Sequence, residues 1–309
     1  GIVAAAANGF GLSGVAPGVS IVNVRAGQDS GFFFLQPVVD ALTYSGDAGL
    51  NVVNMSFFVD PWLYNCDNNP ADTPEQQAQQ RTIKTAVTRA LNYAHRKGVT
   101  LVSAFGNEHT DNGHPLPDAT SPDYPANTQH TRTIDKTTCK SMPSDGPHVI
   151  NVSSFGPSQA KADYSTYGLD GISVSAPGGY FRDGLGTPWY RSLDNEILST
   201  YPRNVAETEG FIDAAGNVTD LGKTNGVQTL TKDGVLSVYR PLQGTSMASP
   251  HASGVAALFS CQYGKYTGGR VSMDPDKVER VLEGTAAKIP CPTPRTVDYT
   301  PVGRPAEFN

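Results

Sequence analysis

The sequence has no long apolar run, and this limits what the chain can be. No stretch approaches the ~18 consecutive apolar residues that a membrane-spanning helix needs. The first residues, Gly1 to Ala4, provide neither the basic segment nor the cleavage site of a secretory signal peptide. We therefore expect no membrane partner, and a chain that is either soluble as it stands or cut from something longer.

The chain also has few charges and no excess of basic ones. Charged residues make up 17% of the 309 positions, and 29 acidic against 23 basic side chains give a net charge of -6. A protein that follows a phosphate backbone needs a basic surface, so we expect no nucleic-acid partner. A hydrophobic content of 38% allows a substantial core, and the length fits one large domain over residues 1–309. Gly and Pro are abundant, at 32 and 23 residues, which indicates a loop-rich globular enzyme.

No two cysteines are close in the sequence. Cys66, Cys139, Cys261 and Cys291 form no CxxC pair, so a thiolate zinc site fits poorly and disulfides fit better. Of the three connectivities, we favour Cys66–Cys139 with Cys261–Cys291, because each bond then joins neighbouring segments. The alternative is four buried free thiols. Either disulfide would indicate an oxidising, extracellular location.

Short apolar segments alternate with helical patterns along the chain. Thr73 and Pro74 begin a helix as N-cap and first helical residue, and Gly98 lies where a C-terminal cap is expected. Strands separated by helices are typical of a parallel sheet that is covered on both faces. The expected strands are 19–24, 51–56, 99–104, 148–153 and 172–176, and the other expected helices are 35–45, 246–262 and 275–284.

Long polar stretches interrupt this pattern. Residues 107–147 are predicted to form a surface loop. We expect loop insertions at about 59–72 and 180–240. Residues 180–235 are polar and Gly-rich and have no clear period, so we predict loops, with a hairpin as an alternative, rather than a second domain.

The most informative run is Gly244-Thr245-Ser246-Met247-Ala248-Ser249-Pro250-His251. A small turn delivers Ser246 to the start of a helix, where Pro250 is expected to be tolerated because the first turn has unpaired N–H groups. The positive helix end favours an oxyanion beside Ser246. A Ser/Thr-rich helix cap is the alternative. An α/β-hydrolase elbow would need a second glycine, which the run lacks.

This run resembles the subtilases, the subtilisin-like serine endopeptidases. Residues 1–8 followed by 14–17 look like the family segment just after its catalytic histidine, residues 54–56 like the substrate-binding strand, and 104–107 like the strand that ends in the oxyanion-hole asparagine. Residues 176–178 also match. The resemblance covers most of the chain and departs at 59–72 and 180–240. It implies an α/β, three-layer subtilisin-like fold with a mainly parallel sheet between helices, truncated at its N-terminus, and it is strongest to secreted bacterial members.

Acyl transfer by serine needs a base, a carboxylate that orients the base, and donors for the oxyanion. The resemblance makes Ser246 the nucleophile and Asn107 an oxyanion donor; the alternative for Asn107 is a turn residue after a strand. In the family, the aspartate lies on an early strand and the histidine in a His-Gly-Thr-His run directly before the segment that begins here at Gly1. We therefore expect the chain to lack both.

The histidines present do not replace the missing base. His251 is five residues after Ser246, which is roughly 140° around and ~7.5 Å along a helix. Asp29-Ser30-Gly31 imitates the aspartate motif, but no apolar strand precedes it and no His-Gly-Thr follows. The other histidines lie in helix or loop contexts and are interpreted as solvated or structural: His95, His109, His114, His130 and His148.

The resemblance also implies a substrate site. Peptide would bind as an extended strand between residues 30–32 and residues 56–58. The walls of the first specificity pocket would be the strands at Ser56 and at 104–106. Asp123 would lie near the pocket floor, where a carboxylate favours Lys or Arg; a surface turn is the alternative. The substrate-binding residues are Ser30, Gly31, Phe32, Ser56, Phe57, Phe58, Ala104, Phe105, Gly106 and Asp123, although the phenylalanines can also be core.

A glycine-rich loop near the N-terminus admits two interpretations. Residues 9–14 spell GxGxxG, but no strand precedes them and no helix follows, so we reject a dinucleotide site. In the family, this loop binds calcium through an asparagine side chain and backbone carbonyls, at positions held here by Asn8, Ala6, Phe10 and Leu12. Other ligands would come from the absent N-terminal region. We expect no cofactor for the chemistry and at most a structural calcium.

The leading hypothesis is a secreted, extracellular serine endopeptidase that cleaves protein or peptide substrates through an acyl-enzyme on Ser246. The alternative is a non-catalytic subtilase-like domain that binds extended peptides. We expect a monomer that shows no turnover when expressed as given.

Overall fold

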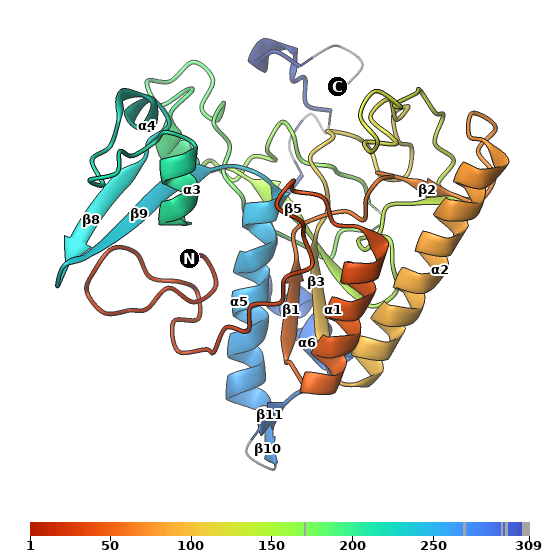
Figure 1. Ribbon diagram of the computed structural model, residues 1–309, viewed down its shortest axis with the longest axis horizontal. Helices are drawn as coiled ribbons and strands as arrows, with labels where there is room; N and C mark the ends of the chain where they lie inside the picture. The colour runs from red at the N-terminus through yellow and green to blue at the C-terminus, as the bar shows by residue number, and fades with distance from the viewer. Residues whose placement is uncertain (170, 268–269, 292, 294–295, 305–309) are drawn as a thin grey trace.

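The computed structural model describes residues 1–169, 171–267, 270–291, 293 and 296–304 (Figure 1). The helices are α1 (Leu35–Ala48), α2 (Pro74–Arg96), α3 (Arg203–Thr208), α4 (Asp220–Thr224), α5 (Thr245–Tyr263) and α6 (Pro275–Thr285), with 3-10 turns η1 (Leu193–Asn195) and η2 (Thr300–Val302). The strands are β1 (Val52–Met55), β2 (Asn65–Cys66), β3 (Thr100–Ala104), β4 (Cys139–Lys140), β5 (Val149–Phe155), β6 (Val174–Pro177), β7 (Ile197–Tyr201), β8 (Gln228–Lys232), β9 (Val235–Leu242), β10 (Lys265–Thr267) and β11 (Arg270–Ser272).

A parallel sheet of order β1-β3-β5-β6 forms the middle layer, and Val102 of β3 lies opposite Ile150 of β5. Successive residues of a strand point to opposite faces. Leu101 therefore packs with α1 and α2, whereas Val102 packs with α5 and α6. The helices on the two sides are visible in Figure 1. The three-layer α/β prediction is confirmed.

Helix α2 begins as predicted. The Thr73 hydroxyl accepts a hydrogen bond from Gln76 N–H (3.3 Å), and Gln76 Oε1 accepts one from Thr73 N–H (2.8 Å), which is a capping box. After the helix, Gly98 has a φ of 92°, a left-handed conformation that favours glycine. The chain thereby turns from α2 directly into β3.

The strand predicted over 19–24 is wrong. These residues have no regular secondary structure, because a strand needs a neighbour for its backbone groups, and in the described part of the chain β1 pairs only with β3. A cavity of about 770 Å³ separates this segment from β1. Ile21 and Val22 are 64% and 49% exposed.

The prediction of loops over residues 180–235 is also wrong. The hairpin is present, as β8 and β9, but it belongs to a larger sheet. Strands β7, β9 and β8 form an antiparallel sheet, and with α3 and α4 they enclose a separate core that includes Phe211 and Val238 (left side of Figure 1). A short-range signal was present in the sequence. Asp233 and Gly234 both have positive φ, and an Asp-Gly pair between two strands is typical of a two-residue hairpin turn.

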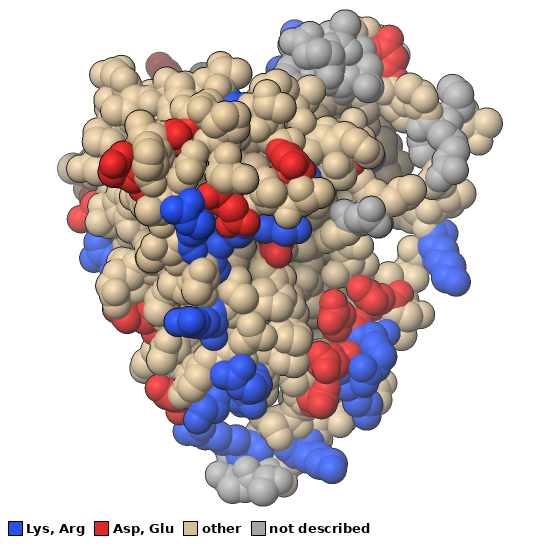
Figure 2. All heavy atoms as spheres, turned by 90° about the vertical axis from the view of Figure 1, so that its right-hand side faces the viewer, with Lys and Arg blue, Asp and Glu red and all other residues tan. Residues whose placement is uncertain are grey.

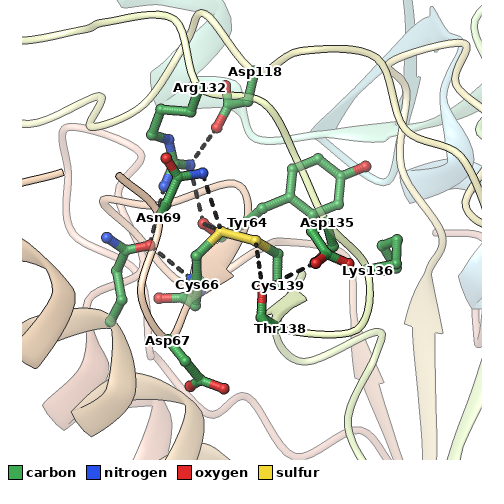
Figure 3. Close-up of a disulfide and its surroundings, with 12 residues drawn as sticks. Tyr64, Cys66, Asp67, Asn69, Asp118, Arg132, Asp135, Lys136, Thr138 and Cys139 are labelled. Atoms are coloured by element: carbon green, nitrogen blue, oxygen red, sulfur yellow. Dashed lines mark hydrogen bonds and ion pairs between the residues drawn. A yellow bond between two sulfur atoms is a disulfide. The ribbon is translucent and has the colours of Figure 1, made fainter. Parts of the chain in front are cut away.

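One of the two predicted disulfides forms. Cys66 of β2 is bonded to Cys139 of β4, and the two residues are directly opposite in this antiparallel pair (Figure 3). Beside it, the buried Arg132 guanidinium binds Asp118 (2.5 Å), Asp72 (3.3 Å) and the Tyr64 carbonyl (2.9 Å). The loop from 59 to 72 is thereby fixed to the loop that carries Cys139.

The predicted Cys261–Cys291 bond is wrong. The structure does not join these residues, and both are exposed. Cys261 lies in α5 and Cys291 follows α6, so nearness of the two segments in sequence did not bring the sulfur atoms together.

Acidic and basic side chains are interspersed on the face over α2, seen from the right-hand side of Figure 1 (Figure 2). Among the described residues, no helix is long and apolar enough to cross a bilayer.

Candidate active site

The turn before α5 presents Ser246 to a cleft. Gly244 is the N-cap, with a φ of 151° that disfavours other residues, and Ser246 is the second residue of the helix. Its backbone N–H lies in the first turn, where an amide has no intrahelical acceptor. Ser246 is half-buried and lines a cleft of about 260 Å³. Ser246 therefore offers both a hydroxyl and an amide N–H at the positive end of a helix.

Pro250 lies inside α5 and not in its first turn, so the predicted reason for its tolerance is wrong. A proline has no N–H for the carbonyl four residues earlier, which here is that of Ser246. The Ser56 hydroxyl donates to this carbonyl instead, at 3.1 Å, and the Ser246 hydroxyl lies 3.5 Å from the Ser56 carbonyl. The proline thus leaves the Ser246 carbonyl free to accept from Ser56, and this bond connects Ser246 to the end of β1.

Asn54 extends this connection. Its Oδ1 accepts hydrogen bonds from the hydroxyls of Ser249 (2.7 Å) and Ser253 (3.1 Å), and its Nδ2 donates to Ser56 Oγ (3.0 Å). The side chain therefore joins one face of α5 to the residue that holds the Ser246 carbonyl.

Asn107 follows β3 and is oriented by Thr245. Its Oδ1 accepts hydrogen bonds from Thr245 N–H (2.9 Å) and from the Thr245 hydroxyl (3.0 Å). Both donors fix the oxygen, so Nδ2 is the part of the amide left for a ligand, beside the turn that precedes Ser246. A Cβ placed on Gly244 would be 3.8 Å from this nitrogen. The Thr245 hydroxyl also accepts from Gly106 N–H (3.2 Å).

The cleft brings together most of the predicted substrate residues. With Ser246 and Asn107, its lining includes Gly31, Ser56, Phe57, Phe58, Ala104, Phe105 and Gly106. Ser30, Phe32 and Asp123 are not part of the lining. The phenylalanines differ in their surroundings: Phe57 is stacked on Phe33 with ring centroids 4.2 Å apart, whereas Phe32 packs against Phe34 and Tyr124.

Sequence reasoning missed several lining residues, among them Asp60, Glu108, Ser141 and Ser144. Glu108 follows Asn107 and accepts a hydrogen bond from the Thr166 hydroxyl (3.1 Å); burial raises the pKa of its carboxyl. Glu108 directly follows Asn107 in the sequence, and this neighbourhood could have identified it as a cleft residue. The two serines follow β4, and nothing in the sequence placed that segment at the cleft.

Asp60 reaches the cleft from beside Asp123. Asp60 is buried and accepts a hydrogen bond from Phe33 N–H, and Asp123 N–H donates to the Pro61 carbonyl (3.0 Å). Burial and the Asp60 carboxyl raise the pKa of Asp123 to about 7, because two adjacent carboxylates repel each other. Two neighbouring carboxyls thus lie at the cleft, with Asp60 in its lining and Asp123 outside it.

None of the described histidines lines the cleft. His251 Nδ1 is 2.8 Å from the Met247 carbonyl, and burial lowers the pKa of this histidine. His114 and His130 lie beside aspartates elsewhere, and the Asp29 side chain is 98% exposed and bound to Arg25. In the described part of the chain, the titratable side chains that share the cleft lining with Ser246 are therefore carboxyls and tyrosine rather than histidine.

The four residues predicted to bind calcium lie in one loop and supply part of a coordination shell. Asn8 Oδ1 accepts a hydrogen bond from Phe10 N–H (3.1 Å), and the Ala6 carbonyl accepts one from Asn8 N–H (3.0 Å). With Leu12, the set offers four neutral oxygens, fewer than the ~6–8 that Ca²⁺ takes.

Comparisons with known proteins agree with this geometry. The model of the subtilase family matches residues 1–304. Thermitase from Thermoactinomyces vulgaris is 27% identical over 94% of the chain, and subtilisin DY from Bacillus licheniformis is 24% identical over 94%. The chain spans 66% of the first relative and 69% of the second. A thermophilic serine proteinase from a Bacillus species is 26% identical over 94% of the chain, which spans 46% of that relative.

Solved structures show the same fold at lower identity. A lanthipeptide protease has a TM-score of 0.60 and 22% identity, with 89% of this chain and 65% of that chain covered. The nisin leader peptidase NisP from Lactococcus lactis has a TM-score of 0.53 and 20% identity, over 93% and 71% of the two chains.

Proposed function

The chain belongs to the subtilase family, and from this premise we propose that it carries the nucleophile and oxyanion site of a serine endopeptidase. The observation that carries the proposal is the arrangement of Ser246 and Asn107, which lie on one cleft and are both fixed by the turn before α5. The proposal includes protein or peptide substrates, secretion, and a monomeric protein. An extracellular protease of Xanthomonas campestris is among the relatives.

In this mechanism, Ser246 Oγ attacks the scissile carbonyl carbon and loses its proton to a base. The negative charge moves to the carbonyl oxygen, where Ser246 N–H and Asn107 Nδ2 donate hydrogen bonds. The intermediate collapses, the protonated amine leaves, and water then hydrolyses the ester by the same steps. The two donors are already held in place, so little reorganisation is needed when charge develops.

We further propose that the base and its carboxylate come from chain outside these 309 residues. No described histidine lines the cleft, and the cavity of about 770 Å³ beside β1 has the edge position of a further strand. An unassisted serine hydroxyl is a weak nucleophile at neutral pH. We expect the 309 residues alone to show no turnover.

The test compares the 309 residues with a longer protein that includes the preceding segment. Each is assayed on a peptide substrate and with a serine-directed phosphonate. The longer protein should turn over substrate and be labelled, and Ser246→Ala should abolish both. Ser260→Ala is the matched control, because Ser260 lies on the same helix away from the cleft. Turnover by the 309 residues that Ser246→Ala removes would show that they contain a base.

A non-catalytic peptide-binding domain is the second candidate, favoured by the absence of a described histidine from the cleft. It predicts that the longer protein binds peptides in the cleft yet neither cleaves them nor reacts with the phosphonate. The same assays therefore distinguish the two functions.

Substrate is proposed to bind as an extended strand along Gly31 and the residues after Ser56, with Asp123 favouring Lys or Arg through the neighbouring Asp60, which lines the cleft. Peptide-library profiling of the longer protein tests this. A profile without basic preference, or one unchanged in Asp123→Ala, would contradict it. A calcium ion at the Asn8 loop stays a prediction that needs ligands beyond the four described.

A further inference from the structure

Three side chains of metal-binding type meet at the end of the sheet opposite the Ser246 cleft. His95 lies in the last turn of α2, His148 directly precedes β5, and Asp276 lies in the first turn of α6. One ligand atom from each lies within 4.8 Å of the other two. Helix α2 leads into β3, so the group is at the amino ends of β3 and β5, whereas Asn107 follows the carboxyl end of β3.

Two contacts already hold these three side chains together. His95 Nε2 is 2.8 Å from Asp276 Oδ1, and the rings of His95 and His148 are stacked with centroids 3.7 Å apart. The His95 side chain is 15% exposed, whereas that of Asp276 is 52% exposed, so a solvent ion can reach the group.

Asn92 orients His148. Its Nδ2 donates to the Thr88 carbonyl (2.9 Å), which turns its Oδ1 toward His148 Nε2 at 3.2 Å. This oxygen accepts the Nε2 proton, so the lone pair of the neutral imidazole is on Nδ1. A histidine that binds a metal commonly donates its other N–H to such an oxygen.

We propose that His95, His148 and Asp276 form a binding site for Zn²⁺. Two imidazoles and one carboxylate are a zinc ligand set, with water in the fourth tetrahedral position. Bonds of ~2.0–2.1 Å put neighbouring ligand atoms about 3.3 Å apart. The exposed His148 ring turns out of its stack on His95 so that its Nδ1 points at the ion, and the exposed Asp276 side chain rotates to reach the same spacing. The ion then replaces the hydrogen bond between His95 and Asp276. Ca²⁺ and Mg²⁺ prefer oxygen ligands and are not expected to bind.

A bound ion would join α2, β5 and α6, which are distant in sequence. It therefore stabilises the folded protein and leaves the cleft geometry unchanged. An ion that binds only the folded state, present at about 100 times its dissociation constant, shifts the folding equilibrium about 100-fold toward the native state.

The test is calorimetric titration of ZnCl₂ into the longer protein bearing Ser246→Ala, which prevents self-digestion. We expect one Zn²⁺ site per chain. Binding should be at least about tenfold weaker in His148→Asn and in Asp276→Asn, since even loss of a residue that only hydrogen-bonds a metal ligand lowers affinity ~10–100-fold. His148 has a φ of 62°, a left-handed conformation that asparagine adopts readily, so this change preserves the backbone. His114→Asn is the matched control, because His114 is 91% exposed and lies 3.5 Å from Asp111.

A second measurement needs no variant of the site. Zn²⁺ should shift the imidazole nitrogen resonances of His95 and His148 and leave those of His114 in place, and it should raise the midpoint of thermal unfolding, reversibly with EDTA. No binding, equal binding in His148→Asn, or MgCl₂ acting as well as ZnCl₂ would overturn the proposal. These outcomes do not depend on protease activity.

Discussion

Thr245→Val removes one hydroxyl and keeps the shape of a buried side chain. That hydroxyl donates to Asn107 Oδ1 (3.0 Å) and accepts from Gly106 N–H (3.2 Å), and Thr245 is fully buried. The variant therefore loses one of the two bonds that orient the oxyanion amide. The other, from Thr245 N–H at 2.9 Å, remains.

The magnitude follows from these two hydrogen bonds. A neutral hydrogen bond contributes about 1 kcal/mol, and leaving Gly106 N–H without its acceptor costs about 1–3 kcal/mol, so we expect a loss of about 2–4 kcal/mol of unfolding free energy. Loss of one anchor of Asn107 should lower kcat about fivefold to tenfold, because ~1 kcal/mol of preorganisation is removed. Asn107→Ala should cost more, about 10²–10³.

The assay is steady-state cleavage of a peptide substrate by the longer protein, with chemical unfolding measured in parallel. Since the oxyanion forms only in the transition state, kcat should fall and KM should stay nearly constant. Thr245→Ser, which keeps the hydroxyl, is the control and should retain most of the activity. A rise in KM at constant kcat, or equal losses in the Val and Ser variants, would refute the assignment of Asn107 as an oxyanion donor held by Thr245.

Three other changes test the surroundings of the cleft. Asp123→Asn should raise the thermal midpoint at pH 8 but not near pH 3. The folded pKa of Asp123, about 7, lies above the unfolded value, so the native state of the unmodified protein loses stability as the pH rises from ~4 to ~7. An effect that does not change with pH would show that burial and Asp60 do not raise the pKa of Asp123. Replacing Cys66 and Cys139 by alanine removes a disulfide that joins residues 73 positions apart, and it should lower the unfolding free energy by about 4 kcal/mol. Denaturant titration under oxidising conditions measures this loss. Reduced wild-type protein is the control and should show an equal loss. Ser56→Ala should destabilise the protein by about 1–3 kcal/mol, because the carbonyl released by the helix proline loses its donor; an unfolding midpoint equal to that of the wild type would contradict this.

Local chemistry explains which elements the sequence predicted. Thr73 and Pro74 specify the start of α2 through a capping box and a fixed φ, whatever the rest of the chain does. The third strand was predicted by a short apolar run that is buried on both faces. The disulfide between Cys66 and Cys139 was one of several pairings that spacing allowed, and only the antiparallel contact of β2 with β4 selected it.

The family and the helix that carries Ser246 were predictable without the structure, because the signal for both is a run of consecutive residues. Three contacts could be seen in the folded protein alone: Thr245 orients Asn107, Ser56 replaces the missing proline donor, and Asp60 rather than Asp123 lines the cleft. Each of these is a contact between segments far apart in the chain, and hydrogen bonds of this kind depend on where the packed layers bring the backbone. Residues 19–24 show the same dependence in reverse, since an apolar run becomes a strand only where another strand lies beside it.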